Sequence, residues 1–214
     1  MLAAVRDRGA AVLTTAITTG YPSLDAYRAS LPDGWASFPT CEASAALFVG
    51  LRERGVFEGL ELAPALSRYV AGSLAADAWL PEVVSVALFL AVRDARFPDS
   101  AGEQAFLAWF QALNAALLDA EYRAQPVASP QEALGSLSDT WARFHRGTSM
   151  TVTAHTAQTA EIAFAHPRLL FPPAWMESRR RMLMGALVRA RAAQPEVLAA
   201  ADGERGTIFR LSWT

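Results

Sequence analysis

The spacing of the apolar residues changes within the stretch RGTSMTVTAHTAQTAEIAFAHPR, from Arg146 to Arg168, and this change indicates the fold class. In MTVTAH the apolar residues alternate with threonine, and in AEIAFAH the isoleucine, the phenylalanine and His166 fall on one face. Residues 156–159, between these segments, are enough to close a hairpin. We therefore expect two antiparallel strands directly after Gly147.

The residues that follow predict a helix and a second hairpin. Pro172 and Pro173 would open a helix that runs to about Ala193, with apolar side chains on one stripe. The segment EVLAAADGERGTIFRLSWT alternates again, and its Asp-Gly pair at 202–203 marks a turn. The last third of the chain is therefore predicted to be a ββαββ unit, an antiparallel sheet with one helix packed on it. The stripe of the helix contains Met176, Leu183, Leu187 and Ala190.

Before Gly147 the apolar residues recur at helical spacing. The segment LPEVVSVALFLAVRDARFP has Pro81 in its first turn and is apolar nearly all round, so we expect a buried, central helix. Capping residues mark three further helices. They begin at Thr40, at Ser100 with Glu103, and at Ser129 with Glu132, and the first and last of them would end at Gly55 and Gly147.

Together these patterns predict an α+β fold, in which a helical N-terminal part packs on the C-terminal sheet-and-helix unit. The chain has 214 residues, of which 52% are hydrophobic, so it can bury a sizeable core. We expect a single domain, with a helical subdomain over residues 1–147 and an α+β subdomain over residues 148–214.

The composition argues against several classes of function. The net charge of −2 disfavours nucleic acid as the main partner, because phosphate binding needs a basic surface. A single cysteine, Cys41, rules out a disulfide framework and a cysteine-rich metal site, and it fits a cytoplasmic protein. The most apolar stretch, Val83–Val92, is about half the length of a membrane span, so we expect no span. The sequence carries no known catalytic motif, so we expect no enzyme activity.

The arrangement resembles a known superfamily, on loose motifs that cover most of the chain. These motifs are FLAVRDARFPDSAGEQAFLAWF, TWARFHRGTSMTVTAH, PPAWMESRRRMLMGALVRA and GTIFRLSW. The superfamily contains the haem-NO/oxygen-binding (H-NOX) domains, the four-vinyl-reductase ligand-binding domains and the core TRAPP vesicle-tethering subunits. Within it, the chain is most similar to a myxobacterial paralogous family of unknown function. The resemblance implies an H-NOX-like fold which, in some members, encloses an apolar cavity between helices and sheet.

The haem signature of the H-NOX domains is not kept. Tyr-x-Ser-x-Arg holds the haem propionates in that family, whereas the matching positions here read Phe164-Ala165-His166-Pro167-Arg168, which retain only the arginine. The proximal haem histidine should lie on the helix before the sheet, and the segment from Glu132 to Arg143 has no histidine. We therefore expect no haem and no other cofactor.

The three histidines are 10 and 11 residues apart and fall on different elements, which predicts no metal site. We expect His145 to be a partly exposed residue in the last turn of a helix. His155 shares its face of the strand with threonines and should point to solvent. His166 precedes a proline at a strand end and should be a hydrogen-bonded edge residue.

Two further candidates have both a structural and a functional interpretation. Cys41 follows a predicted N-cap, where a helix N-terminus lowers the pKa of a thiol, but a packing role is the interpretation that we favour. Arg179, Arg180 and Arg181 are interpreted as a solvated helix face, with an acidic partner or a bound carboxylate as the alternative.

The candidate ligand site combines aromatic side chains with a histidine and a glycine. The aromatic residues lie on the helices before the sheet, where they form either core or the wall of a ligand pocket. Gly185 lies inside a helix, where glycine usually needs a packing reason, so we expect a close approach there and place the pocket mouth or a dimer seam at that point. The predicted ligand-binding residues are Phe106, Trp109, Phe110, Trp141, Phe144, His145 and Gly185.

The sequence supports three hypotheses of function, in order of preference. The first is a non-enzymatic ligand-binding or sensory domain for a small hydrophobic molecule. The second is a homodimeric protein-interaction or signalling module without ligand, in which the apolar helix Val83–Val92 packs across the dimer. The third is a haem or metal protein that uses His145 or His166.

Overall fold

The computed structural model describes residues 20–71, 74–99, 102–122, 129–201 and 206–214. The chain divides into two compact units, residues 1–109 and residues 110–214, and the boundary falls inside the helix α6 (Gly102–Tyr122). The secondary structure changes from helix to sheet around Gly147, where we placed the subdomain boundary. That the chain is a single domain, with two subdomains that meet at Gly147, stays a prediction.

The N-terminal unit is built around the buried helix α5 (Glu82–Arg96), which Pro81 precedes as predicted. The side chains of Val83–Val92 are at most 7% exposed, so the chain itself covers the apolar surface on which the dimer hypothesis rested. A short antiparallel pair, β1 (Glu42–Ser44) and β2 (Trp79–Pro81), leads into this helix. The surrounding elements are α2 (Pro22–Ser30), the short 3-10 helix η1 (Gly34–Ala36), α3 (Ala46–Glu53) and α4 (Pro64–Ala71).

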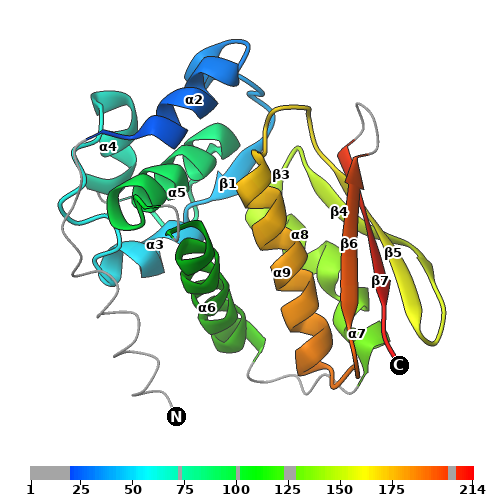
Figure 1. Ribbon diagram of the computed structural model, residues 1–214. Helices are drawn as coiled ribbons and strands as arrows, with labels where there is room; N and C mark the ends of the chain where they lie inside the picture. Colours follow the sequence, from blue (N-terminus) through cyan, green and yellow to red (C-terminus); the bar gives the residue numbers. More distant parts are fainter. Residues whose placement is uncertain (1–19, 72–73, 100–101, 123–128, 202–205) are drawn as a thin grey trace. The chain divides into compact units, whose positions relative to one another are not determined.

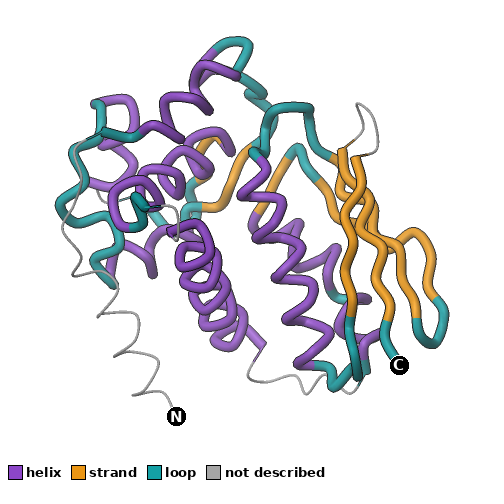
Figure 2. The backbone as a smooth tube through the Cα atoms, viewed as in Figure 1, coloured by secondary structure: helices purple, strands orange, loops and turns teal. Residues whose placement is uncertain are grey.

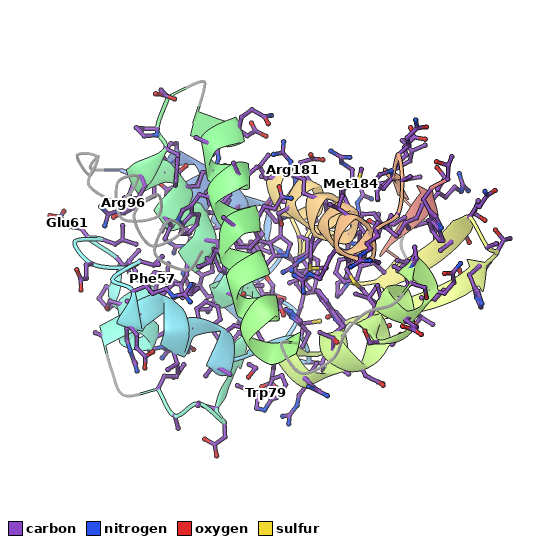
Figure 3. The ribbon with its side chains drawn as sticks, turned by 90° about the horizontal axis from the view of Figure 1, so that it is seen from below. Phe57, Glu61, Trp79, Arg96, Arg181 and Met184 are labelled. Atoms are coloured by element: carbon purple, nitrogen blue, oxygen red, sulfur yellow. The ribbon has the colours of Figure 1, made fainter. Side chains whose placement is uncertain are left out.

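Charged residues near the end of α5 hold neighbouring segments of this unit. The Asp94 carboxylate accepts hydrogen bonds from the backbone N–H groups of Ser23 (2.7 Å) and Leu24 (3.1 Å), and so caps the start of α2 from another helix. Arg96 donates to the carbonyl of Glu58 at 2.7 Å, and Figure 3 shows it near the loop that carries Phe57. These contacts explain why a predominantly apolar helix ends in buried charges.

The helix predicted from Thr40 is wrong at its start. Residues 42–44 form the strand β1, and α3 begins only at Ala46. The backbone N–H of Ala45 bonds to the carbonyl of Ala78 at 2.9 Å, so pairing with a distant segment overrides the local capping signal. The predicted stop at Gly55 is sound, because this glycine follows the helix with a φ of 67°.

The C-terminal unit is the predicted ββαββ arrangement, which confirms the α+β fold. The strands β4 (Ser149–His155), β5 (Thr159–Ala165), β6 (Glu196–Ala201) and β7 (Gly206–Ser212) form an antiparallel sheet in the order β4-β5-β7-β6. The helix α9 (Pro173–Arg189) lies alongside β6 (Figure 1), and Figure 2 shows the strands as one layer. The predicted turn at residues 202–203 lies outside the described residues, as does Ser100 of the predicted capping box.

Side chains of alternate residues form the core beneath this sheet. Ile162 lies opposite Phe209, and Met150 lies opposite Phe164, so their side chains share one face. The predicted stripe is buried at Leu183 and Leu187 of α9 and at Ala190 directly after it, while Met176 is only half-buried. The helix ends at Arg189, a few residues before the predicted end at about Ala193. On β4 the register shifts between Val152 and Ala154, and Ala154 is exposed, so the alternation predicted for MTVTAH is interrupted there.

The single helix predicted between Ser129 and Gly147 is two helices. The N-cap at its start is confirmed, since the Ser129 hydroxyl accepts the backbone N–H of Glu132 at 3.2 Å. The first helix, α7 (Pro130–Gly135), then ends, and α8 (Leu137–Phe144) begins one residue later. The break falls at a Gly-Ser pair, where glycine is a poor helix former and the Ser136 hydroxyl donates to the Ala133 carbonyl at 3.2 Å.

The predicted helix end at Gly147 is also wrong. The chain leaves α8 at Phe144 and continues as the two-residue strand β3 (His145–Arg146). Gly147, with a φ of 70°, makes the turn from β3 into β4.

Over the described residues, no helix is both long enough and apolar enough to cross a bilayer.

Candidate functional site

The C-terminal unit contains a cluster of aromatic rings between the sheet, α8 and α9. Its centre is Phe164 of β5, which is 1% exposed. The Phe164 ring lies 4.9 Å from Trp141 in an edge contact, 5.3 Å from Phe171 and 4.8 Å from His166, measured between ring centroids. We define the aromatic cluster as Phe110, Trp141, His145, Phe164, His166, Phe171, Trp175 and Phe209, together with Arg179.

Arg179 brings a positive charge into this cluster. Its guanidinium carbon lies 4.7 Å from the centroid of the Trp175 ring and 5.1 Å from that of Trp141, within cation–π range of both indoles. The residue is only 6% exposed, so the prediction that it belongs to a solvated helix face is wrong. Trp175 and Arg179 are four residues apart on α9, which places both on the same side of the helix.

The two neighbouring arginines do partly face solvent, and both bind Glu177. Arg180 donates to the two carboxylate oxygens at 2.7 Å each, and Arg181, which Figure 3 labels on α9, donates at 3.0 Å. Chiefly because of the Arg180 hydrogen bonds, the pKa of Glu177 falls to about 2. Arg180 also reaches the carbonyl of Val197 on β6 at 3.3 Å, which ties the helix to the sheet.

His145 is buried, which corrects the expectation of a partly exposed residue in a helical turn. It follows α8 in an extended conformation, and its ring stacks on Trp141 at 3.8 Å with an angle of 11° between the planes. The Trp141 indole N–H donates to the Thr148 hydroxyl at 3.0 Å, so a hydrogen bond and the stacking contact with His145 together fix this indole. Because α8 ends three residues earlier than predicted, the chain turns His145 inward instead of continuing the helix.

His166 is a hydrogen-bonded edge residue, as predicted. Nδ1 lies 2.9 Å from the Pro167 carbonyl, which only accepts, so Nδ1 carries the proton and Nε2 accepts from the Thr207 hydroxyl at 3.2 Å. Burial lowers the pKa of this histidine from its ordinary value. His155 is exposed on β4 opposite Ala160, also as predicted. In the parts of the chain that the structure describes, no group of three potential metal ligands comes together.

The structure separates the predicted ligand-binding residues. Trp141, His145 and Phe110 belong to the aromatic cluster, where the Phe110 ring lies 5.4 Å from Trp175. Phe106 and Trp109 belong to the N-terminal unit and pack around Phe97, at 5.7 and 5.8 Å. Phe144, at the end of α8, is half-buried. A role in ligand binding stays a prediction for each of these residues.

The close approach expected at Gly185 is wrong. A methyl group added there would meet one atom within 4 Å, the side-chain nitrogen of Gln111, at an ordinary contact distance of 3.8 Å. Gln111 is a flexible, exposed side chain of α6, so it leaves room for a larger residue at this position. Nothing that the structure describes explains why this residue is glycine.

Six members of the cluster were not among the predicted ligand-binding residues, although a bound carboxylate was the alternative interpretation of Arg179; they are Phe164, His166, Phe171, Trp175, Arg179 and Phe209. Phe171 and Trp175 have parallel rings, with an interplanar angle of 1° and a centroid distance of 6.1 Å. Arg179 lies one helical turn after Trp175. The i, i+4 spacing of this tryptophan and arginine was visible in the sequence, and it is the signal that would have found the pair.

The described residues do not fit haem in the way that the resemblance implies. At the signature positions, Phe164 is a core ring without a hydroxyl, both nitrogens of His166 are hydrogen-bonded, and Arg168 is exposed. The histidine nearest to the expected proximal position, His145, lies flat against an indole. The expectation of no haem therefore stays a prediction, now with a structural reason.

Cys41 does not lie at a helix N-terminus. It is a buried residue directly before β1, and its carbonyl accepts the backbone N–H of Glu82 at 2.8 Å. Burial raises the pKa of the Cys41 thiol, and the nearby Glu82 charge adds to the effect, against a hydrogen bond from Thr40. The suggested activation of this thiol is therefore wrong, and the packing role is the one that its surroundings favour.

Neither a protein-family model nor a curated protein sequence matches this chain. Among solved structures, the Fe(II) unliganded H-NOX protein from K. algicida is similar to it, with a TM-score of 0.54 and 10% identity, over 80% of this chain and 96% of that one. A point mutant of the same protein is similar with a TM-score of 0.53 and 8% identity, over the same shares of the two chains. At such low identity the likeness shows the fold alone, and that fold is the predicted H-NOX-like one.

Proposed function

We propose that the chain is a non-enzymatic ligand-binding or sensory domain, in which the aromatic cluster of the C-terminal unit binds a small hydrophobic molecule. The observation that carries the proposal is the buried Arg179 guanidinium, which lies within cation–π range of both the Trp141 and the Trp175 indole. Replacing a buried ion pair by well-packed apolar residues of similar volume is often neutral for stability, so the burial of a charge is weak evidence of a stabilising role. Such a charge among aromatic faces is therefore a candidate for function.

The shared fold supports the proposal by analogy only. The similar solved structures are H-NOX proteins, one of them described as Fe(II) unliganded. A fold can be kept while its site changes, and here the signature positions lack the groups that would hold a haem. We therefore infer a ligand other than haem, and a chain with no resident cofactor. The proposal includes a cytoplasmic location and the likeness to the myxobacterial family.

A homodimeric protein-interaction module stays the alternative. The buried helix α5 no longer supports it, because its apolar surface is covered within the chain. The exposed large hydrophobic residues of the described chain are Leu169, Val188 and Leu198. They lie on a loop, a helix and a strand respectively. Single exposed residues of this kind are normal on a monomer surface.

Titration of the full chain with N-phenylnaphthylamine, a neutral apolar dye that fluoresces on leaving water, tests the proposal. We expect one saturable site per chain, with affinity at least about ten-fold weaker in Trp175→Ala, because that change removes a wall of the cluster. Trp35→Phe is the control, since Trp35 lies in the N-terminal unit and is half-buried. No saturable binding, or equal binding by all three proteins, would contradict the proposal.

A further inference from the structure

We infer that two copies of this chain associate through the outer face of the C-terminal sheet, which is the side of the sheet away from Phe164 and Phe209. The partner is therefore a second copy of the chain. Because the aromatic cluster lies on the other side of the same sheet, the inference is independent of the proposed ligand site. It is drawn from the residues of the outer face and from the register of the four strands.

The strand pairing arranges the outer face in two rows, each with one residue from β6, β7, β5 and β4. In this strand order, the first row contains Leu198, Arg210, Glu161 and Ala154. The second row contains Ala200, Ile208, Ala163 and Thr151. All eight residues are exposed or half-buried, and five of them are apolar, whereas the solvated face of an antiparallel sheet is normally polar.

The apolar residues of the outer face are neighbours. Leu198 is 58% exposed, which is ordinary for a residue taken singly. In the next row, Ala200, Ile208 and Ala163 extend the apolar surface across three strands. An apolar surface that is contiguous and bordered by polar residues is typical of an interaction site.

The two rows are complementary to themselves. A two-fold axis that runs between β5 and β7, parallel to the strands, places β5 of one copy over β7 of the other, as in an isologous dimer. Since Glu161 and Arg210 are directly paired on these strands, each Glu161 then faces Arg210 of the second copy. Ala163 and Ile208 are paired in the same way, so a small side chain faces a large one. Unlike charges that face each other fix the register of such a contact.

The outer strands match under the same axis. It places β6 over β4 of the second copy, so that Leu198 faces Ala154 and Ala200 faces Thr151. Each of these pairs contains at least one small side chain. Small residues at facing positions suit two sheets that pack about 10 Å apart with their strands aligned within about 30°.

The size of the outer face sets the expected strength of the dimer. Four strands that are about 4.8 Å apart and about seven residues long span a face of about 19 by 24 Å. This is near the lower limit for a specific interface, so we expect a weak dimer with a dissociation constant in the micromolar range.

Sedimentation equilibrium of the full chain, from about 1 to about 200 µM, tests the inference. We expect the mass to rise from the 23.0 kDa of one chain towards twice that value. Leu198→Arg should weaken the dimer at least about ten-fold, because it buries an additional charge in the contact. Val188→Arg is the matched control, since Val188 is equally exposed, at 59%, but lies on α9 outside the outer face. This control should associate as the parent does.

A charge exchange tests the axis itself. Glu161→Arg places like charges opposite each other in the two copies and should weaken the dimer at least about ten-fold. Arg210→Glu should have the same effect, and the double exchange should restore the association of the parent. Circular dichroism of each variant shows that a lower mass reflects dissociation of folded chains.

The outcomes separate the inference from the proposed function. A parent that stays at 23.0 kDa over the whole range overturns the inference, and the dye titration still decides the ligand site. A dimer that Leu198→Arg leaves unchanged, or that Val188→Arg weakens as much, forms through another surface and also overturns it. If the double exchange does not restore association, the two-fold arrangement is wrong.

Discussion

Replacing Trp141 by alanine should destabilise the chain strongly, because this side chain is both packed and hydrogen-bonded. Trp141 is 5% exposed, stacks on His145 and meets the edge of Phe164. Truncation of a buried tryptophan costs about 3–5 kcal/mol. The lost hydrogen bond to Thr148 contributes about 1 kcal/mol of this total, and each aromatic pair about 0.5–1.5 kcal/mol.

Two further variants separate these contributions. Trp141→Phe keeps a ring in the cluster but leaves the buried Thr148 hydroxyl without the indole donor, so we expect a loss of about 1–3 kcal/mol. Trp35→Ala, in the N-terminal unit, should cost less than Trp141→Ala because its side chain is only half-buried.

Urea denaturation of ligand-stripped proteins, followed by far-ultraviolet circular dichroism, measures the free energies of unfolding. A loss below about 1 kcal/mol for Trp141→Ala, with unchanged ligand binding, would refute the packing of this residue and its place in the site together.

Four other expectations follow from the same structure. The purified protein should be colourless and show no Soret band after haemin is added. A Soret band that disappears in His145→Ala would contradict the prediction that the chain binds no haem. The paired Glu177 has a lowered pKa, so its contribution to stability should be present above about pH 4.5 and be lost as the pH falls towards about 2. In Glu177→Gln, the unfolding free energy should depend less on pH over this range. Burial lowers the pKa of His166, so stability should fall as the pH drops below 6.5, and His166→Asn should remove that slope when the two proteins are unfolded at matched pH values. Gly185→Ala should raise the unfolding free energy by about 0.5–1 kcal/mol, because the new methyl group meets only Gln111; a loss of stability would mean that the glycine has a packing role after all.

The sheet could be predicted because its evidence is local. The sequence signals mark two hairpins, β4–β5 and β6–β7, whose strands pair with their neighbours in sequence, so His155 lies opposite Ala160 as the four-residue connection requires. The pairing of β5 with β7 joins segments that are distant in sequence. The strand β1 was missed because its partner, β2, lies far along the chain. A capping residue followed by apolar positions then outweighed a pairing that local sequence does not reveal.

The site was predicted only in part, because its residues come from separate elements. Trp141, Trp175 and Phe164 lie on two helices and a strand, and no spacing rule relates them. A run of three arginines does not by itself say which one faces inward. The structure selects Arg179, because it lies one helical turn after Trp175 and therefore on the buried side of α9.

Native mass spectrometry of the protein as purified would show whether the aromatic cluster holds a ligand, since it reports bound small molecules and the number of subunits together. We expect one small-molecule adduct per chain, which is lost from Trp175→Ala and retained in Trp35→Phe. The bare mass of the chain for the parent protein, or an adduct that Trp175→Ala keeps unchanged, would contradict a ligand site in the aromatic cluster.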